Sequence, residues 1–551
     1  MTKGNHLEDA YAATLGRIKA QKGSRSRLGM EALMWVSNSE RPLHTTGLCH
    51  ALGVKIGSAD FDVENIPTIR TLLACALGLI TVEASTSTVR LVHFSLQEYL
   101  SHNPNLFQSP HSVIAEVCLT YLSFRHVWEL SPTLSSAPLT APFVGYASGY
   151  WGKHVKSGGT RSVSPLALKL LIGFEQHISS QLLLLRYYED ERSRELDFGG
   201  SRCSKGFTGL HGAAFFGIVE IFATLLAMKE WDINATDSRG RTALAWGAVG
   251  GHEDVVTIIL QHKDAKADTA DIEFGLTPLW LAAMCGHEGV VRLLLEREDV
   301  NPNTADAESG RTPLLLAAGR GDEGMVKLLL EREDINPNTA GTEFGMTPLL
   351  LAATNGNEGT VRLLLEREDI NLNTTDTEYG QAPLLWAVKN EKEGVVKLLL
   401  EREDINPNTA ETGLGITPLL LAAKSGNEGI VRLLLEREDT NPNTTETAYG
   451  RTPLLLATVN RDEGIVKLLL EREDINPNIT DTEFGQTPLA WAAEYGYEGV
   501  VKLLLERDNV HLDLPNLIGK TALQLAATGG HARVVELLSA PKFSYRPSRY
   551  R

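Results

Sequence analysis

A pattern of the form Gly-x-Thr-Pro-Leu, or a close variant, recurs through the C-terminal two-thirds of this 551-residue chain. Successive copies start 34 or 35 residues apart, which defines ten repeats, beginning at Gly206, Gly240, Gly275, Gly310, Gly345, Gly380, Gly415, Gly450, Gly485 and Gly519. A fixed period of this length is typical of architectures in which each repeat covers its hydrophobic face with its neighbours. The sequence therefore predicts a solenoid over residues 206–540 rather than several globular domains.

The repeat at residues 310–344 shows the expected local structure. Thr312 before Pro313 predicts the start of a short helix, because the hydroxyl caps free N–H groups and proline suits the first helical turn. Gly321 is the expected left-handed stop. The second helix has apolar residues too widely spread for one buried stripe, so it should be sandwiched between copies of itself. The Asn- and Pro-containing segment that follows predicts turns and a short extended arm.

This helix–turn–helix–loop repeat resembles the ankyrin repeat, whose signature is Thr-Pro-Leu-His-x-Ala followed by Gly-His and a leucine-rich second helix. The family histidine survives only as His211, and mostly apolar residues such as Trp280 and Leu315 stand in its place elsewhere. Glu391 and Arg461 replace the helix-stop glycine in two repeats, at an expected cost of about 1 kcal/mol each. The first and last repeats are atypical, and we expect both to act as solubilising caps.

The N-terminal 205 residues have a different pattern. Helices are predicted near residues 28–36, 48–52 and 67–77, followed by a β-hairpin over 79–83 and 88–94. Ser95 to Glu98 has the form of a capping box that opens another helix. We therefore expect a mostly α chain with a winged-helix-like domain at 1–125, a helical linker at 126–205, the ankyrin repeats at 206–540 and a short basic tail at 541–551.

The predicted winged-helix region also has a more specific resemblance. LMWVSNSERPLHTTGLCHALGV, NIPTIRTLLACALGLITVE and VRLVHFSLQEYL are similar to the region just after the NACHT nucleotide-binding domain of fungal NLR-like receptors, many of which end in ankyrin repeats. In that family a nucleoside-triphosphatase switch is coupled through a winged helix to a ligand-sensing array. His93 falls where the family often places a nucleotide-sensing histidine, although a structural role is favoured here.

Nucleotide chemistry is not predicted for this chain, because no segment has the form G-x-x-x-x-G-K-[S/T]. Gly519-Lys520-Thr521 is the nearest match, and Leu514 stands where its first glycine should be. We therefore expect the NACHT domain to be absent. The five cysteines are scattered, with no Cys-x-x-Cys pair, and no catalytic constellation stands out. The Glu-Arg-Glu-Asp runs are interpreted as a solvated charged edge. The sequence thus predicts no enzyme, no metal and no cofactor.

Charge and hydropathy constrain the partners. The net charge is −17, and residues 1–205 hold 20 basic against 17 acidic residues, so the acidity belongs to the repeats. The predicted winged helix has too weak a positive field to hold DNA, and no nucleic-acid partner is expected. The longest uncharged apolar run, residues 72–82, is about half of what a bilayer span needs, and the N-terminus has no apolar signal core. We expect no membrane partner and a cytoplasmic location, with the nucleus as the alternative.

Sequence variation between repeats points to the binding surface. The resemblance implies that arms and short helices form a concave groove that binds partner proteins, and these positions vary while the scaffold repeats. The candidate partner-binding residues are Phe274, Met284, Arg311, Arg320, Phe344, Asn355, Tyr379, Lys389, Lys424, Tyr449, Arg451, Phe484 and Tyr495. Neutral drift on an unconstrained surface is the alternative explanation.

The function predicted from the sequence is a non-enzymatic protein–protein interaction adaptor or scaffold. One alternative is a truncated NLR-like signalling receptor, of the fungal immunity or incompatibility type, whose NTPase is missing or supplied in trans. A nuclear co-regulator is the other.

Overall fold

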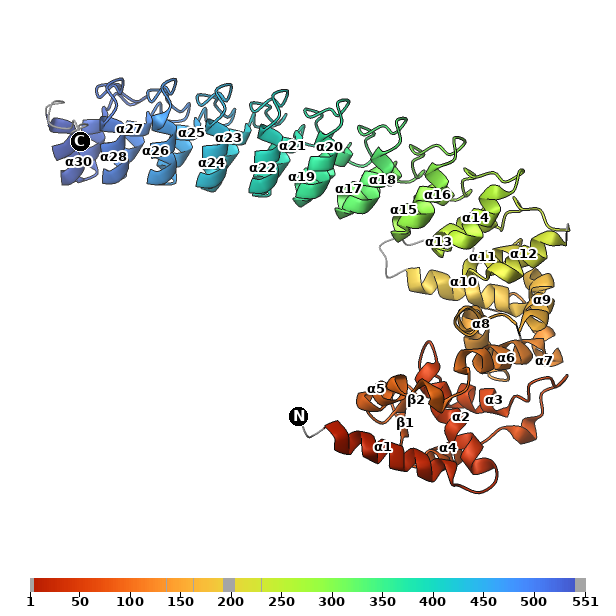
Figure 1. Ribbon diagram of the computed structural model, residues 1–551. Coiled ribbons are helices and arrows are strands. Elements are labelled where there is room, and N and C mark those ends of the chain that lie inside the picture. Colours follow the sequence, from red (N-terminus) through yellow and green to blue (C-terminus); the bar gives the residue numbers. More distant parts are fainter. Residues whose placement is uncertain (1–3, 135, 162, 192–203, 229, 541–551) are drawn as a thin grey trace. The chain divides into compact units, whose positions relative to one another are not determined.

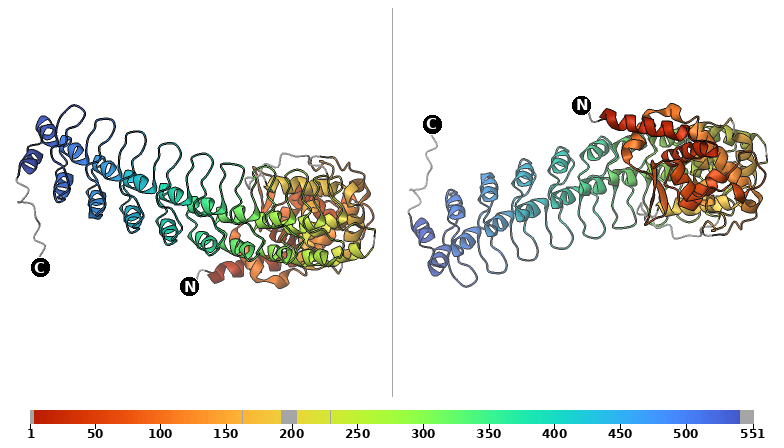
Figure 2. Two further views of the ribbon diagram at one scale, coloured as in Figure 1. Left: turned by 90° about the horizontal axis from the view of Figure 1, so that it is seen from above. Right: turned by 90° about the horizontal axis from the view of Figure 1, so that it is seen from below.

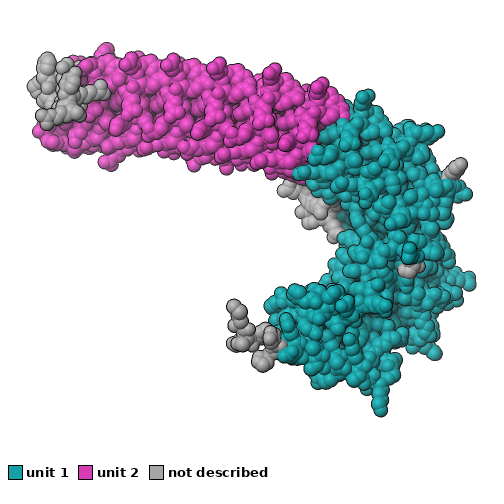
Figure 3. Space-filling model, in the orientation of Figure 1, with its two compact units in different colours: residues 1–301 teal, residues 302–551 magenta. Residues whose placement is uncertain are grey.

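A computed structural model describes residues 4–134, 136–161, 163–191, 204–228 and 230–540. The basic tail expected at 541–551 lies outside the described residues. The chain divides into two compact bodies, residues 1–301 and residues 302–551, drawn as unit 1 and unit 2 in Figure 3. We call them the N-terminal body and the C-terminal body, and each is described by itself.

The N-terminal body begins with the expected winged-helix domain (Figure 1). Its elements are α1 (Gly4–Lys19), α2 (Ser24–Asn38), α3 (Thr45–Gly53), the 3-10 turn η1 (Val63–Asn65), α4 (Ile69–Cys75), β1 (Ile80–Glu83), β2 (Thr88–Leu91) and α5 (Phe94–His102). The two strands pair antiparallel, with Ile80 opposite Leu91. Trp35, Leu72 and Val89 are almost completely buried and form part of the core. The winged-helix-like fold and the mostly α class are confirmed.

The start of α5 differs from the prediction. His93, not Ser95, is the N-cap, and its Nδ1 accepts a hydrogen bond from the N–H of Ser95 at 3.2 Å. The capping box expected at Ser95 is therefore wrong: the helix starts two residues earlier, where an imidazole nitrogen satisfies the free N–H group. His93 has this structural role at the exposed start of the helix.

The segment expected to be a helical linker is packed. It follows η2 (Pro104–Leu106) and α6 (Pro110–Ser123), and it contains α7 (Arg125–Trp128), α8 (Val144–Gly158), α9 (Ser164–Ile172), η3 (Phe174–Gln176) and α10 (Ile178–Glu191). Phe143, Trp151 and Phe174 in this segment are fully buried. Side chains of this size bury 150 Å² or more each. Phe143 contacts Trp35 of the winged helix, and Trp151 and Phe174 contact Phe216 and Phe207 of the first repeat, so these helices pack against both neighbours and are not a free connection.

The repeats of the N-terminal body continue from these helices. They comprise α11 (Gly209–Phe216), α12 (Val219–Ala227), α13 (Ala243–Val249), α14 (Glu253–Gln261), α15 (Pro278–Cys285) and α16 (Glu288–Leu295). A Cβ at Gly212 would lie 2.7 Å from the Phe174 ring, and one at Gly209 would collide with the backbone of Leu171. The prediction that the first repeat is a terminal cap is therefore wrong. Its glycines let the preceding helices approach closely and cover it.

The C-terminal body continues the array with seven helix pairs in its described residues. They are α17 (Pro313–Arg320) and α18 (Glu323–Leu330), α19 (Pro348–Asn355) and α20 (Glu358–Leu365), α21 (Pro383–Lys389) and α22 (Glu393–Leu400), α23 (Pro418–Ser425) and α24 (Glu428–Leu435), α25 (Pro453–Val459) and α26 (Glu463–Glu471), α27 (Pro488–Glu494) and α28 (Glu498–Leu505), and α29 (Ala522–Thr528) and α30 (Ala532–Ser539). The arms between pairs project side by side along one edge of this body (Figure 2).

Local signals in the repeats have the predicted geometry. Thr312 Oγ1 accepts a hydrogen bond from the N–H of Leu315 at 3.2 Å, with Pro313 in the first turn, and Gly321 ends α17 with φ of 72°. Glu391 and Arg461 occupy the same left-handed position with φ of 56° and 58°. Two side-chain-bearing residues therefore hold a backbone conformation that glycine adopts more easily.

Candidate interaction surface

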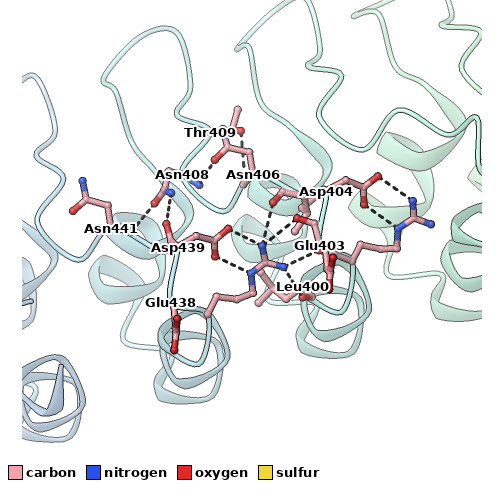
Figure 4. A network of polar contacts seen from close by, with 12 residues as sticks. Leu400, Glu403, Asp404, Asn406, Asn408, Thr409, Glu438, Asp439 and Asn441 are labelled. Atoms are coloured by element: carbon pink, nitrogen blue, oxygen red, sulfur yellow. Dashed lines mark hydrogen bonds and ion pairs between the residues drawn. The ribbon is translucent and has the colours of Figure 1, made fainter. Parts of the chain in front are cut away.

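A ladder of asparagines joins neighbouring repeats of the C-terminal body (Figure 4). Asn408 Nδ2 donates to the carbonyl of Asp439 at 2.7 Å, and its Oδ1 accepts from the N–H of Asn441 at 2.8 Å, both in the following repeat. The same pair of bonds recurs at the equivalent residues Asn303, Asn338, Asn373, Asn443 and Asn478. The Asn-Pro-Asn segment therefore does more than form turns, because one of its asparagines also couples adjacent repeats.

The Glu-Arg-Glu-Asp runs form a second set of inter-repeat contacts. Arg437 donates Nε and Nη2 to the carboxylate of Asp439 at 2.9 and 2.7 Å, and Nη1 to the carbonyls of Leu400 and Arg402 of the preceding repeat at 3.1 and 2.7 Å. The pKa of Asp439 lies below its usual value, mainly because its carboxylate accepts these hydrogen bonds from Arg437. Arg472 repeats this arrangement one repeat later.

This second network corrects the prediction of a simple solvated edge. The glutamates of the runs, such as Glu401 and Glu471, are exposed as expected. The arginines are instead partly buried and act as structural links, since a guanidinium can donate to a carboxylate and to carbonyls at the same time. Much of the charge on this edge is therefore committed within the array.

Buried carboxylates hold the base of several arms. Asp376 Oδ1 accepts from the N–H groups of Glu378 and Tyr379 at 3.0 and 2.6 Å, and its Oδ2 accepts from the N–H of Gln381 and the indole Nε1 of Trp386 at 2.8 and 3.0 Å. Burial by itself raises the pKa of Asp376, but these hydrogen bonds together hold it below its usual value. The carboxylate thus fixes the arm turn that carries Tyr379.

The turns present a row of large side chains to solvent. The residue before each arm glycine is between 44% and 48% exposed at Phe344, Tyr379, Leu414, Tyr449 and Phe484. Single exposed apolar residues are ordinary on protein surfaces, whereas a regular row of them is an informative feature. We call this row, together with the exposed ends of the first helices α17, α19, α21, α23, α25 and α27, the arm face.

Two clusters on the arm face contain three of the six aromatic candidates. In the first, Lys389 Nζ lies 4.9 Å from the ring centre of Tyr379 and 4.4 Å from that of Trp386. In the second, Trp491 stacks on Tyr495 at 5.3 Å and lies 5.9 Å from Phe484. A cation over an aromatic ring is attracted to it electrostatically, as in the first cluster, and neighbouring rings attract one another, as in the second. The side chains of each cluster therefore form a group rather than isolated exposed residues.

Arg451 joins the second cluster to the neighbouring arm. Its guanidinium lies 4.6 Å from the Tyr449 ring and 5.6 Å from the Trp491 ring, and it forms an ion pair with Glu483 at 3.3 Å. Tyr449, Arg451 and Lys424 also line a small pocket of about 120 Å³. The structure therefore brings together candidates that lie in different repeats of the sequence.

The remaining candidates are more separate. Arg320 and Asn355 are exposed at the ends of α17 and α19, and Arg311 is paired with Glu343 at 3.9 Å. Phe274 and Met284 belong to the N-terminal body, where Phe274 is half-buried and Met284 is only 8% exposed. Met284 thus contributes to packing, which leaves it little surface for a partner.

Trp386 and Trp491 are functional candidates that the sequence analysis missed. They occupy the fourth position of their first helix, where the other repeats of the C-terminal body that begin with proline have Leu316, Leu351, Leu421 and Leu456. An indole at a position otherwise filled by leucine is the signal that could have identified them, because it combines apolar area with a polar N–H group.

The described residues contain no group of three or more His, Cys, Asp or Glu side chains that could hold a metal ion. Within the same residues, no helix has both the length and the apolar character needed to cross a bilayer.

Successive helix pairs, each followed by an arm and linked to the next by asparagine and arginine side chains, define a helical repeat solenoid. The ankyrin repeats family (3 copies) matches residues 168–271, 263–340, 334–411, 403–481 and 473–546. The chain belongs to the ankyrin-repeat family. This membership supports a role in protein–protein interaction, and the ankyrin fold is typically non-enzymatic.

Other comparisons concern parts of the chain. Residues 17–112 match the family described as GPI inositol-deacylase, winged helix domain. The crystal structure of the ankyrin repeat domain of Bcl-3, described as a unique member of the IkappaB protein family, is 25% identical and covers 42% of this chain and 100% of that chain, with a TM-score of 0.38. At this TM-score the likeness adds nothing to the fold already described. No curated protein matches the sequence significantly.

Proposed function

We propose that this protein is a non-enzymatic cytoplasmic adaptor that binds partner proteins through the arm face of its C-terminal body. The observation that carries the proposal is the difference between the two edges of the repeats. The arginines and aspartates of the helix-end edge are committed to links within the array, whereas the arm face exposes side chains that differ from repeat to repeat.

The composition of the arm face supports a protein partner. Protein interfaces are enriched in aromatic residues and arginine, and their strongest contacts come from such residues in partly preformed pockets. Tyr449 and Arg451 have this character beside the small pocket, and Trp491 stacks on Tyr495 nearby. The other exposed candidates, Arg311, Arg320, Asn355 and Lys424, would add polar contacts around them.

A second candidate function is an NLR-like signalling protein whose NTPase is missing or supplied in trans. The observation that favours it is the winged-helix match at residues 17–112, which precedes an ankyrin array in the same chain. In this reading residues 1–125 would be the part that follows a NACHT domain, and the repeats at 206–540 would sense the ligand. Both candidate functions use the arm face for recognition.

A photo-crosslinking experiment on the full chain tests the adaptor proposal. The crosslinking amino acid p-benzoylphenylalanine would replace Tyr379 or Tyr449 on the arm face, and Glu401 or Glu471 on the helix-end edge as matched exposed controls. We expect the same partner to be captured from the arm-face positions and not from the control positions. Capture from the control positions alone would place the interface on the glutamate edge and leave the arm variation to neutral drift.

Alanine substitution supplies the quantitative test once a partner is captured. Changing Arg311, Arg320, Lys389 and Tyr495 together should leave folding nearly intact, since surface changes usually cost within about 0.5 kcal/mol each. The same set should weaken the partner by about 1 kcal/mol or more, because arginine and tyrosine are frequent anchors. Replacing Glu331, Glu401 and Glu471 with glutamine is the control and should change little beyond the salt dependence.

A further inference from the structure

The N-terminal body contains a pocket of about 390 Å³ that is lined by residues of α8, α10 and the first two repeats. This volume falls within the range of small-molecule binding sites. The pocket is lined by Gly149, Lys153, Lys156, Leu183, Arg186, Tyr187, Phe215, Phe216, Val249, Gly250 and His252. All of these residues lie in elements that pack on one another in the same body, and none belongs to the arm face.

One wall of the pocket is apolar and aromatic. Phe215 lies 5.9 Å from the Tyr187 ring and 5.3 Å from the Phe216 ring, and Phe216 itself is held against Trp151 at 4.9 Å. Gly152 on α8 allows this contact, because a Cβ there would collide with the Phe216 ring. The wall is therefore rigidly placed, and it offers flat surfaces on which a planar ring could stack.

The polar part of the lining is cationic. Lys153 and Lys156 are exposed one helical turn apart on α8, and Arg186 reaches the pocket from α10 with its guanidinium 3.4 Å from the Tyr150 ring centre. Among the described residues that line the pocket, none is acidic. Three positive side chains with a partly buried aromatic wall create a positive potential that favours an anion.

His252 orients one of these cations without adding charge. Its Nε2 donates to the carbonyl of Phe215 at 2.9 Å, so its Nδ1 is left to accept from Lys156 Nζ at 3.1 Å. Burial, and then the positive charge of Lys156, lower the pKa of His252 to about 4, which keeps the imidazole neutral near pH 7. The hydrogen bond thus places the Lys156 ammonium at the pocket.

We propose that this pocket is a binding site for a small organic anion with a planar aromatic ring, the ring lying against Phe215 and Tyr187 and the anionic group facing Lys153 and Lys156. Such a site would make ligand binding a property of the N-terminal body. It does not depend on the proposed partner binding by the arm face.

Fluorescence titration of the full chain with 1-anilinonaphthalene-8-sulfonate tests the site. We expect saturable one-to-one binding, and at least tenfold weaker binding of the uncharged analogue N-phenyl-1-naphthylamine. Changing Lys153 and Lys156 together to alanine should weaken binding of the sulfonate at least tenfold. Lys169→Ala removes an exposed lysine of α9 outside the lining and should leave binding unchanged.

A second variant separates charge from shape. Changing Lys153 and Lys156 to glutamine removes the charges but keeps polar side chains of nearly the same length, so it should weaken binding of the sulfonate as much as the alanine pair does and leave binding of the neutral probe unaffected. Circular dichroism would confirm that all variants are folded. The proposal is overturned if the sulfonate binds at several equivalent sites, if the neutral probe binds equally well, or if the double lysine variants bind like the unchanged protein.

Discussion

Removing one asparagine of the inter-repeat ladder should weaken the coupling between two adjacent repeats. Asn408→Ala deletes both the bond from Nδ2 to the Asp439 carbonyl and the bond from the Asn441 N–H to Oδ1. A protein hydrogen bond contributes about 0.5–1.5 kcal/mol net, and the half-buried position lets water replace part of each bond. We therefore expect a loss of about 1–2 kcal/mol, located at the interface between two repeats.

Asn406→Ala is the matched control in the same arm. Asn406 Oδ1 accepts only from the N–H of Asn408 at 3.0 Å, within its own repeat. Its loss should cost about 1 kcal/mol or less and leave the interface intact. In a solenoid, stability is approximately a sum of repeat and interface terms, so only the interface change should make the array unfold in separate steps.

Two measurements, urea unfolding curves and native-state hydrogen exchange, distinguish the two variants. Asn408→Ala should broaden or split the transition and increase exchange at the Asn441 amide and its neighbours, whereas Asn406→Ala should shift a transition of unchanged shape. If both variants lower stability equally and leave the shape of the transition unchanged, the ladder does not couple the repeats and the reasoning fails.

Three further perturbations follow from other contacts. Asp268 occupies the position at which the ladder has asparagine in later repeats, and its Oδ2 already accepts a hydrogen bond from the Asn301 N–H. Asp268→Asn adds a donor, so it should raise the free energy of unfolding by about 0.5–1.5 kcal/mol in urea denaturation at pH 7. Burial raises the pKa of Asp268 in the folded state, so the contribution of this carboxyl to stability should fall as pH rises, whereas the contributions of Asp376 and Asp439, whose pKa values are lowered, should rise; the stability gained by the variant should therefore be larger at pH 7 than at pH 3. Glu391→Gly should raise the free energy of unfolding by about 0.5–1 kcal/mol in the same assay, because it relieves the left-handed strain at this position. Arg461→Gly should gain less, because it also removes the cation that lies 5.6 Å from the Tyr497 ring, and equal gains would contradict this. Trp491→Leu, which restores the residue of the other repeats, should keep the helix and weaken a captured partner about tenfold in a binding titration, and unchanged affinity would remove this cluster from the interface.

The repeated local signals were predictable from the sequence because each depends on residues a few positions apart. Thr312, Pro313 and Gly321 specify a helix start and stop within one repeat, and the same holds for the left-handed positions of Glu391 and Arg461. The winged helix was predictable for the same reason, apart from the two-residue shift at α5. Local chemistry is sufficient for these features since no distant group decides them.

What the sequence could not reveal depends on neighbours about one repeat away. Asn408 has the composition of a turn residue, and only stacking of the repeats shows that its amide meets Asp439. The atypical first repeat suggested a terminal cap, whereas the lack of a side chain at Gly212 makes room for Phe174 from a helix outside the predicted array.

The asparagine ladder also determines how the array can change its length. Each asparagine bonds to backbone groups 31 and 33 residues further along the chain, and these offsets are constant from Asn338 to Asn443. Loss of residues 376–410 would bring Asn373 opposite Asp439 and Asn441 with the same local contacts it now makes to Asp404 and Asn406. Recombination between such similar segments can therefore delete or duplicate a whole repeat without disturbing the joints that remain. The number of repeats, and with it the extent of the arm face, can therefore change while the asparagine contacts between adjacent repeats stay the same.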